Sequence, residues 1–327
     1  MARREGAGPP LPPAATGPLR PVLALVLNGF VWGVSWWPFR QLQAAGLHPL
    51  LATALVYVLS VLVLLAVRPA AWRALFTQPV VWVLAAAAGM TNVGFNWAVT
   101  VGDVVRVVLL FYLMPAWTVL LAWLLLGEKP TAVSLLRMLL AMAGVAVVLK
   151  TPGTAWPVPE TLADWLALAG GFSFALNNIM LRRLQSVPAE SRVLAMFVGG
   201  ALLAGTAAAL GLQLGFVAAP EAIRSSWWLG LVLALGFLAS NVALQYGASR
   251  LNAHTTALIM LSEVVFASLS SVALGASQLT RQVVVGGVLI LAAAAWSAWP
   301  GKTQQPNATQ QPNAEVAKVR RGRRRMQ

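Results

Sequence analysis

The sequence predicts an all-α polytopic membrane protein, with ten transmembrane helices arranged as two inverted five-helix repeats. Three observations lead to this prediction: an apolar composition, ten long apolar runs, and an internal duplication. Of the 327 residues, 59% are hydrophobic and 10% are charged, and the mean hydropathy is +0.75. Because a soluble globular protein carries about 25% charged residues, this chain lacks the polar side chains to cover a water-facing surface.

Ten runs in the sequence are long and apolar enough to cross a bilayer. A helix that crosses the ~30 Å hydrocarbon core needs about 20 mostly apolar residues. Runs of this kind, separated by charges, Pro or Gly, lie at about 21–39, 49–67, 79–99, 104–126, 131–149, 161–181, 191–213, 227–247, 252–274 and 281–299. We expect four segments: a disordered cytoplasmic tail (1–20), two five-helix repeats (21–150 and 151–300) and a basic disordered cytoplasmic tail (301–327).

Basic residues predict the orientation. With the N-terminus in the cytoplasm, most Lys and Arg outside the spans fall on the cytoplasmic side, as the positive-inside rule requires. We therefore expect an integral protein of the cell membrane, a bacterial inner membrane, with both termini cytoplasmic. The Arg run of the C-terminal tail either only anchors this topology or also contacts anionic lipid, at about 1 kcal/mol per charge.

Composition also excludes several classes of site. The chain has no cysteine and two histidines, so we expect no metal site and no cofactor. The net charge of +14 is concentrated in the tails and at the ends of apolar runs, so we expect no nucleic-acid partner. There is no Walker A loop to drive the protein directly with ATP. The oligomeric state is not predicted.

The two halves of the sequence resemble each other. With a shift of 148, residues 102–131 align with 250–279, which places Pro115 over Glu263 and Gly127 over Gly275. With a shift of 142, residues 28–43 align with 170–185, which places Gly29 over Gly171 and Arg40 over Arg182. Because each copy holds five spans, the copies have opposite orientations, and inverted repeats with a site at their interface are typical of transporters.

Four stretches carry a resemblance to a known family: FVWGVSWW, LMPAWTVLLAWLLLGEKPT, LSEVVFASLSSVALG and GGVLILAAAAW. Over residues 20–300 the chain resembles the drug/metabolite transporter superfamily, in its EamA-type branch. The resemblance implies two inverted five-helix bundles, with helices 1, 3, 4, 6, 8 and 9 around a central cavity. It also implies secondary transport, often export, of amino acids and similar metabolites. The chain departs from the family where Gly275-Ala276 replaces a second copy of Gly127-Glu128.

Glu263 is the outstanding candidate site residue, because it lies halfway along an apolar span with Thr256 and Ser270 on the same helix face. It could bind a proton for coupling or capture a substrate amine. Alternatively, it is a neutral carboxyl at a kink, since it replaces the proline of the fourth span. Arg106 and Asp103, three residues apart, are expected to pair, either as a gate or as an interfacial ion pair. Arg137 is expected to extend toward the membrane surface.

Polar and aromatic side chains at helical spacing complete the candidate binding site. They either bond one another across helices or bind the polar groups of a solute. Gly29 and Gly33 beside them predict close helix packing. Pro115 frees the carbonyl of Phe111 from its helical hydrogen bond, next to Tyr112. The candidate substrate-binding residues are Asn28, Trp32, Ser35, Trp36, Asn92, Asn96, Tyr112, Phe174, Asn178, Asn241, Gln245 and Glu263.

We therefore predict a secondary transporter, and not an enzyme, that moves small metabolites by alternating access at the interface of the repeats. Trp, Phe, Asn and one carboxyl suit neutral or aromatic amino acids or related amphipathic molecules as exported substrates, and Glu263 could couple their export to protons. Two alternatives remain: a polytopic membrane enzyme acting on lipid-like substrates, which would need catalytic residues that the spans do not offer, and a passive channel.

Overall fold

The computed structural model describes residues 19–150, 156–220, 227–248, 250–251 and 253–298. These residues form helices joined by loops, with no strand among them. The predictions made for the two tails fall outside this part of the chain, except for Leu19 and Arg20, which begin the first helix. The described residues therefore test the helical body of the protein and not its termini.

The helices follow the predicted apolar runs. In the first half they are α1 (Leu19–Val34), α2 (Trp36–Ala44), α3 (Pro49–Val67), the 3-10 helix η1 (Pro69–Trp72), α4 (Arg73–Thr77), α5 (Val80–Val101), α6 (Val104–Phe111), α7 (Met114–Leu126) and α8 (Ala132–Leu149). In the second half they are α9 (Leu162–Arg183), α10 (Ala189–Leu214), α11 (Trp227–Ala248), α12 (Ala253–Met260), α13 (Ser262–Ala273) and α14 (Arg281–Ala298).

Three of the predicted runs are interrupted, although each was predicted as one continuous span. The first is divided at Ser35 into α1 and α2, the fourth at Tyr112 and Leu113 into α6 and α7, and the ninth at Leu261 into α12 and α13. Seven helical stretches of the described residues are long and apolar enough to cross a membrane, and two shorter apolar helices lie at 258–273 and 281–296. The architecture is that of a polytopic membrane protein.

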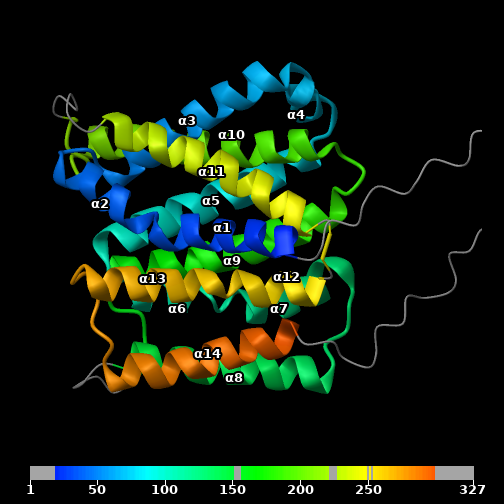
Figure 1. The fold of residues 1–327 in the computed structure, drawn as a ribbon, viewed down its shortest axis with the longest axis vertical. Helices are drawn as coiled ribbons and strands as arrows, with labels where there is room; N and C mark the ends of the chain where they lie inside the picture. Colours follow the sequence, from blue (N-terminus) through cyan, green and yellow to red (C-terminus); the bar gives the residue numbers. More distant parts are fainter. Residues whose placement is uncertain (1–18, 151–155, 221–226, 249, 252, 299–327) are drawn as a thin grey trace, which may run out of the picture.

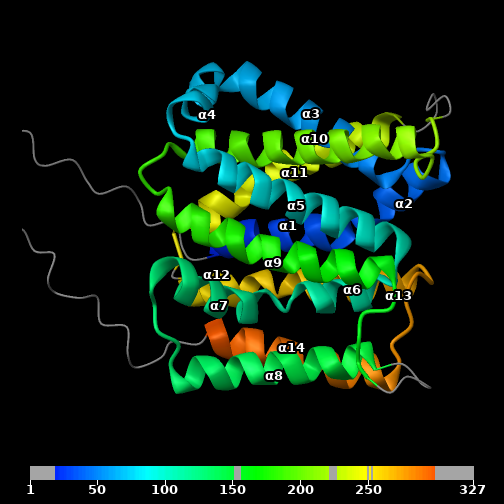
Figure 2. The ribbon, with the colours of Figure 1, turned by 180° about the vertical axis from the view of Figure 1, so that it is seen from behind.

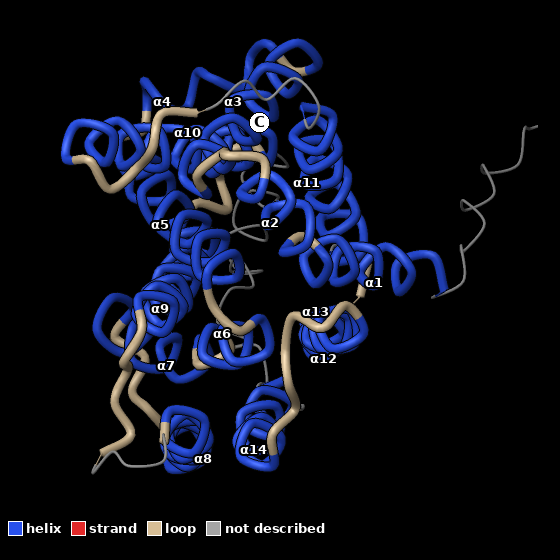
Figure 3. Tube along the Cα trace, turned by 90° about the vertical axis from the view of Figure 1, so that its left-hand side faces the viewer, coloured by secondary structure: helices blue, strands red, loops and turns tan. Residues whose placement is uncertain are grey.

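The helices lie roughly side by side in a bundle (Figure 1). α3 and α10 lie together at one edge, α8 and α14 pack against each other at the opposite edge, and α1, α5 and α9 lie between them. Figure 2 shows the same order from behind. In the end-on view of Figure 3, α6 and α13 lie between this middle layer and the α8–α14 pair.

The two halves pack in equivalent ways. α5 contacts α9 and α10, while α11 contacts α1 and α3, which are their counterparts in the other half. α7 contacts α9 as α13 contacts α1. A cluster of buried apolar side chains surrounds α6 and joins it to α5, α8, α9, α13 and α14. The interrupted helices α6–α7 and α12–α13 are therefore held inside the bundle by continuous helices.

Candidate functional site

The two interruptions inside the bundle have different local causes. Pro115 has no N–H group, so the carbonyl of Phe111 receives no hydrogen bond from it, and α6 ends at Phe111. No proline interrupts the ninth run. Instead, the N–H of Val264 bonds to the carbonyl of Leu261, three residues before it, which leaves the carbonyl of Met260 without its usual partner from the same helix. Each interruption therefore exposes a backbone carbonyl inside the bundle.

Glycines of neighbouring helices pack directly on these interruptions. A Cβ atom added to Gly29 of α1 would lie 2.5 Å from Oγ of Ser262, and one added to Gly33 would lie 2.7 Å from the carbonyl oxygen of Glu263. On the other side, a Cβ atom on Gly171 of α9 would lie 2.5 Å from the carbonyl oxygen of Phe111. The close packing predicted for Gly29 and Gly33 is present. Gly171, which aligns with Gly29, makes the equivalent contact in the other half.

Tyr112 and Glu263 join the two interruptions. Oη of Tyr112 lies 3.1 Å from Oε2 of Glu263 and 3.1 Å from the carbonyl oxygen of Met260, and both side chains are buried. The phenol has one proton to donate. If Glu263 is protonated, its carboxyl donates to Oη and Tyr112 donates to Met260. If Glu263 is ionised, Tyr112 donates to the carboxylate, and Met260 loses its donor. Protonation of Glu263 thus makes the phenol proton of Tyr112 available to the carbonyl of Met260, at the end of α12.

Aromatic rings extend from this pair across five helices, beginning with Phe111, whose ring lies 6.4 Å from that of Tyr112. Trp32 of α1 stacks on Phe237 of α11 at 4.4 Å between ring centroids and contacts Phe95 of α5 edge-on at 6.2 Å. Phe95 lies 4.9 Å from Phe111, whose ring is 5.5 Å from Phe174 of α9. The predicted residues Trp32, Tyr112 and Phe174 therefore belong to one aromatic series. The sequence analysis missed Phe95, Phe111 and Phe237, whose only signal was their aromatic character on inward faces.

Trp36 and Ser35 lie at the junction of α1 and α2. Nε1 of Trp36 donates to Oγ of Ser270 on α13 at 3.0 Å, so Ser270 is on the face that the sequence predicted. Oγ of Ser35 donates to the carbonyl of Trp32 at 2.8 Å, within its own chain segment. Trp36 therefore connects the two halves of the protein, whereas Ser35 stabilises the local turn.

The amides mostly bond to neighbouring helices. Nδ2 of Asn28 donates to Ser240 of α11, and Nδ2 of Asn96 donates to Oγ1 of Thr53 on α3 at 3.4 Å. Nδ2 of Asn241 donates to the carbonyl of Phe237 in its own helix. Asn28 and Asn96 are buried, and their Oδ1 atoms receive no hydrogen bond. These two amides retain acceptor capacity inside the bundle.

Three further predicted residues are more dispersed. Asn92 is buried on α5, Asn178 is half-buried on α9, and Gln245 is exposed on α11. The fully enclosed amide on α9 is instead Asn177, which is 2% exposed and whose Oδ1 has no partner.

The predicted pairing of Arg106 with Asp103 is wrong. Arg106 forms a two-point ion pair with Asp164 of α9, at 2.7 and 3.0 Å, and also donates to the carbonyl of Val148. The carboxylate of Asp103 accepts the backbone N–H of Arg106 and so caps the start of α6. The guanidinium of Arg137 lies 5.3 Å from the ring of Trp296 on α14, a contact that the sequence analysis did not predict.

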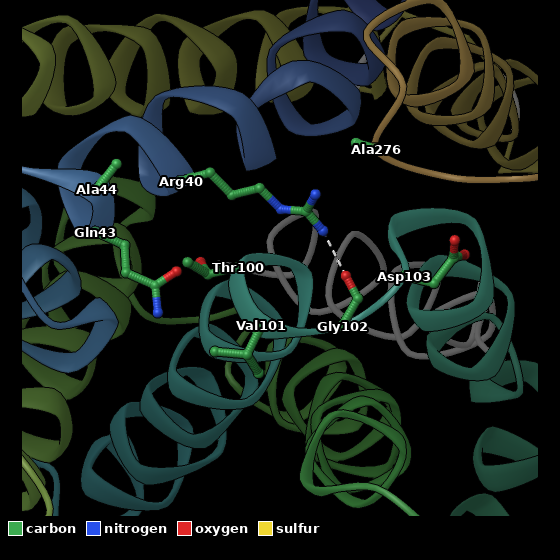
Figure 4. Close-up of a pocket in the computed structure, with 8 residues that line it drawn as sticks. All are labelled: Arg40, Gln43, Ala44, Thr100, Val101, Gly102, Asp103 and Ala276. Carbon is green, nitrogen blue, oxygen red and sulfur yellow. Dashed lines mark hydrogen bonds between the residues drawn. The ribbon is translucent and has the colours of Figure 1, made fainter.

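Two pockets lie at the end of the bundle where α2 ends and α6 begins, which we call the Arg40 end. The first, of about 560 Å³, is drawn in Figure 4 and is lined by Arg40, Gln43, Ala44, Thr100, Val101, Gly102, Asp103 and Ala276. The second, of about 420 Å³, shares Asp103 and Ala276 with the first and extends to Arg106 and Lys150. Both are separate from the Tyr112–Glu263 pair in the bundle interior.

Comparison with known proteins gives a family match over part of the chain and a similar fold. Residues 19–150 match the model of the EamA-like transporter family. A crystal structure of a protein with 20% sequence identity aligns over 84% of this chain and 96% of its own length, with a TM-score of 0.52. At that identity the likeness concerns the fold alone. No curated protein matches the chain.

Proposed function

We propose that this chain, whose residues 19–150 match the EamA-like transporter family of the drug/metabolite transporter superfamily, is a proton-coupled exporter of small metabolites. Neutral or aromatic amino acids, or related amphipathic organic molecules, are its substrates. The observation that carries the proposal is the contact of Tyr112 with both Glu263 and Met260, where two interrupted helices meet. Interrupted helices inside a bundle are the usual setting of transporter sites.

The proposal includes ten membrane spans in two inverted repeats. Three observations support it. Equivalent helices of the two halves make equivalent contacts. Gly29 and Gly171 pack on opposite interruptions. Gly127 and Gly275, which align, end α7 and follow α13 with φ of 70° and 68°. Two halves that share a fold and have opposite orientations can exchange conformations, so that the site opens first to one side of the membrane and then to the other. Both termini then lie in the cytoplasm.

Proton coupling follows from the two hydrogen-bonding states of Tyr112. Protonation of Glu263 lets Tyr112 stabilise the end of α12, and deprotonation removes that bond. A proton therefore changes the interruption at which α12 and α13 can bend relative to each other. A carboxyl enclosed by apolar side chains is also costly to ionise, which favours release of the proton only when water or a substrate amine reaches it.

The side chains around the pair support the substrate class. Trp32, Phe95, Phe111 and Phe174 offer aromatic faces and edges, which suit an apolar or aromatic side chain. The unpartnered Oδ1 atoms of Asn28 and Asn96 are acceptors for an ammonium group.

Uptake into proteoliposomes tests the proposal. Wild-type protein is expected to accumulate at least one labelled amino acid from a mixed pool only when a pH gradient is imposed. Glu263→Gln keeps the shape of the side chain and removes its ionisation, so it should retain exchange of labelled for unlabelled substrate but lose gradient-driven accumulation. Glu128→Gln is the matched control, because Glu128 lies exposed at the far end of α7.

Each outcome has a separate meaning. Equal accumulation by wild type and Glu263→Gln removes proton coupling through Glu263 and leaves transport. Failure of wild type to move any amino acid removes the substrate class. If ions or solutes pass through the protein at rates far above the turnover of a carrier, a channel is favoured.

A further inference from the structure

An ion pair at one end of the bundle has no counterpart between the aligned residues at the other end. At the end opposite to the Arg40 end, Arg182 at the end of α9 forms an ion pair with Glu128, which follows α7, at 2.8 Å. Arg183 beside it donates to the carbonyl of Leu125. This ion pair joins the end of α7 to the end of α9. We call this the Glu128 end.

The duplicated sequence places the equivalent residues at the Arg40 end. Arg40 aligns with Arg182, and Ala276 aligns with Glu128. The local structure agrees, because Gly275 precedes Ala276 with positive φ as Gly127 precedes Glu128. Arg40 and Ala276 face each other across the 560 Å³ pocket (Figure 4). A pocket therefore lies where the other half of the protein has a carboxylate bound to an arginine.

Arg40 is held in place by backbone groups. Its Nε donates to the carbonyl of Val99 at 3.1 Å, one Nη donates to the carbonyl of Gly102, and the guanidinium lies 5.1 Å from the ring of Trp36. These contacts use one edge of the guanidinium. Its other terminal nitrogen, Nη1, has no acceptor among the described residues. An oriented guanidinium with free N–H groups is the form of arginine that binds carboxylates best.

Among the described residues, no carboxylate forms an ion pair with Arg40. Asp103 is the one acidic residue that lines it, and this carboxylate already accepts the N–H of Arg106. Arg106 and Lys150 line the adjoining pocket, and Asp164 is bound to Arg106. The first pocket itself is lined by one charge of each sign, Arg40 and Asp103.

We propose that the pocket between Arg40 and Ala276 binds the carboxylate of the substrate, which takes the position that Glu128 holds beside Arg182 at the opposite end. The proposal rests on the transport function above and adds to it a carboxylate requirement at one end only. At the Glu128 end the arginine is already paired with a residue of the chain. At the Arg40 end it is available to an organic acid or an amino acid.

Cysteine chemistry tests this even while the substrate is unidentified, because the natural chain has no cysteine. Ala276→Cys places a single thiol opposite Arg40 in the full chain, purified in detergent. Its reaction rates with an anionic reagent, methanethiosulfonate ethylsulfonate, and a cationic one, methanethiosulfonate ethyltrimethylammonium, are compared. Addition of Arg40→Gln should lower the anionic-to-cationic rate ratio about fivefold, as expected for loss of one nearby, partly screened charge.

Two controls separate local charge from misfolding. Arg40→Lys in the same background should keep the ratio, because it retains the positive charge. Ala132→Cys, at an exposed alanine of the Glu128 end, should give a ratio that does not respond to Arg40→Gln. If Arg40→Gln leaves the anionic-to-cationic rate ratio of the Ala276→Cys thiol unchanged, the proposal is overturned.

The second part of the experiment tests carboxylate binding itself. 3-Phenylpropionate should slow the labelling of the Ala276→Cys thiol, phenethyl alcohol should not, and Arg40→Gln should abolish the difference. Equal effects of the two compounds, or no effect of either, would contradict carboxylate binding. Neither part depends on transport, so a failed amino-acid uptake assay would remove the proposed function while these rates still decide the role of Arg40.

Discussion

Replacement of Gly33 by alanine probes the close contact on which the site geometry depends. The added Cβ would lie 2.7 Å from both the carbonyl oxygen of Glu263 and Cβ of Phe266. Because neither backbone nor a Cβ atom can rotate away, α1 and α13 must separate by about half an ångström or more. Overpacking of this kind costs about 1–3 kcal/mol, against a gain of roughly 0.5–1 kcal/mol for alanine in a helix.

Thermal unfolding in detergent, followed by tryptophan fluorescence, measures this change. We expect Gly33→Ala to lower Tm by several degrees, at about 2–4 °C per kcal/mol. Gly205→Ala is the matched control, because its Cβ would meet only Cβ of Ala54, at 4.0 Å, and it should leave Tm unchanged or raised. The packing argument would be refuted by equal Tm values for the two variants, or by a Gly33→Ala protein that is the more stable.

Three other perturbations have distinct expected results. Asp164→Asn should destabilise the protein by about 3 kcal/mol because it leaves a half-buried arginine unpaired, whereas Glu128→Gln, in an exposed pair, should cost under about 1 kcal/mol; similar Tm losses would be contrary evidence. Burial lowers the pKa of His48, whose ring accepts a backbone N–H at the start of α3. Its contribution to stability should therefore be lost as the pH falls below 6.5, and His48→Asn should remove this fall in Tm from the Tm–pH profile. Trp36→Phe should cost about 1 kcal/mol through its bond to Ser270, and adding Ser270→Ala should cost little more; full additivity would argue against the bond.

The sequence predicted where helices occur better than where they break. Apolar runs define the helices because each must cover about 20 residues of hydrocarbon, and their bounds agree closely with the structure. Pro115 marked one interruption in advance. The interruption at Leu261 carries no proline, and it depends on Tyr112 of another helix to satisfy the carbonyl of Met260. Such a break is set by tertiary packing, which a single run of residues does not encode.

The candidate site was predicted in part for the same reason. Helical spacing identified Trp32, Trp36 and Glu263 on inward faces, because their relative positions depend on one helix alone. The partner of Arg106 could not be found this way. Asp103 is close in sequence, but its carboxylate is used by the helix N-terminus, and the ion pair forms with Asp164, 58 residues away. On α9 the sequence analysis named Asn178, which is half-buried, and did not name its neighbour Asn177, which is fully buried.

The most direct test of the account is substrate-dependent proton movement through the Tyr112–Glu263 pair. Proteoliposomes containing a trapped pH-sensitive dye and wild-type protein receive an amino acid that the uptake assay has identified. The account predicts a change in internal pH that requires the amino acid and disappears in Glu263→Gln, while both proteins still exchange labelled for unlabelled substrate. Transport by the wild type with no proton movement, or proton movement that survives Glu263→Gln, would contradict it.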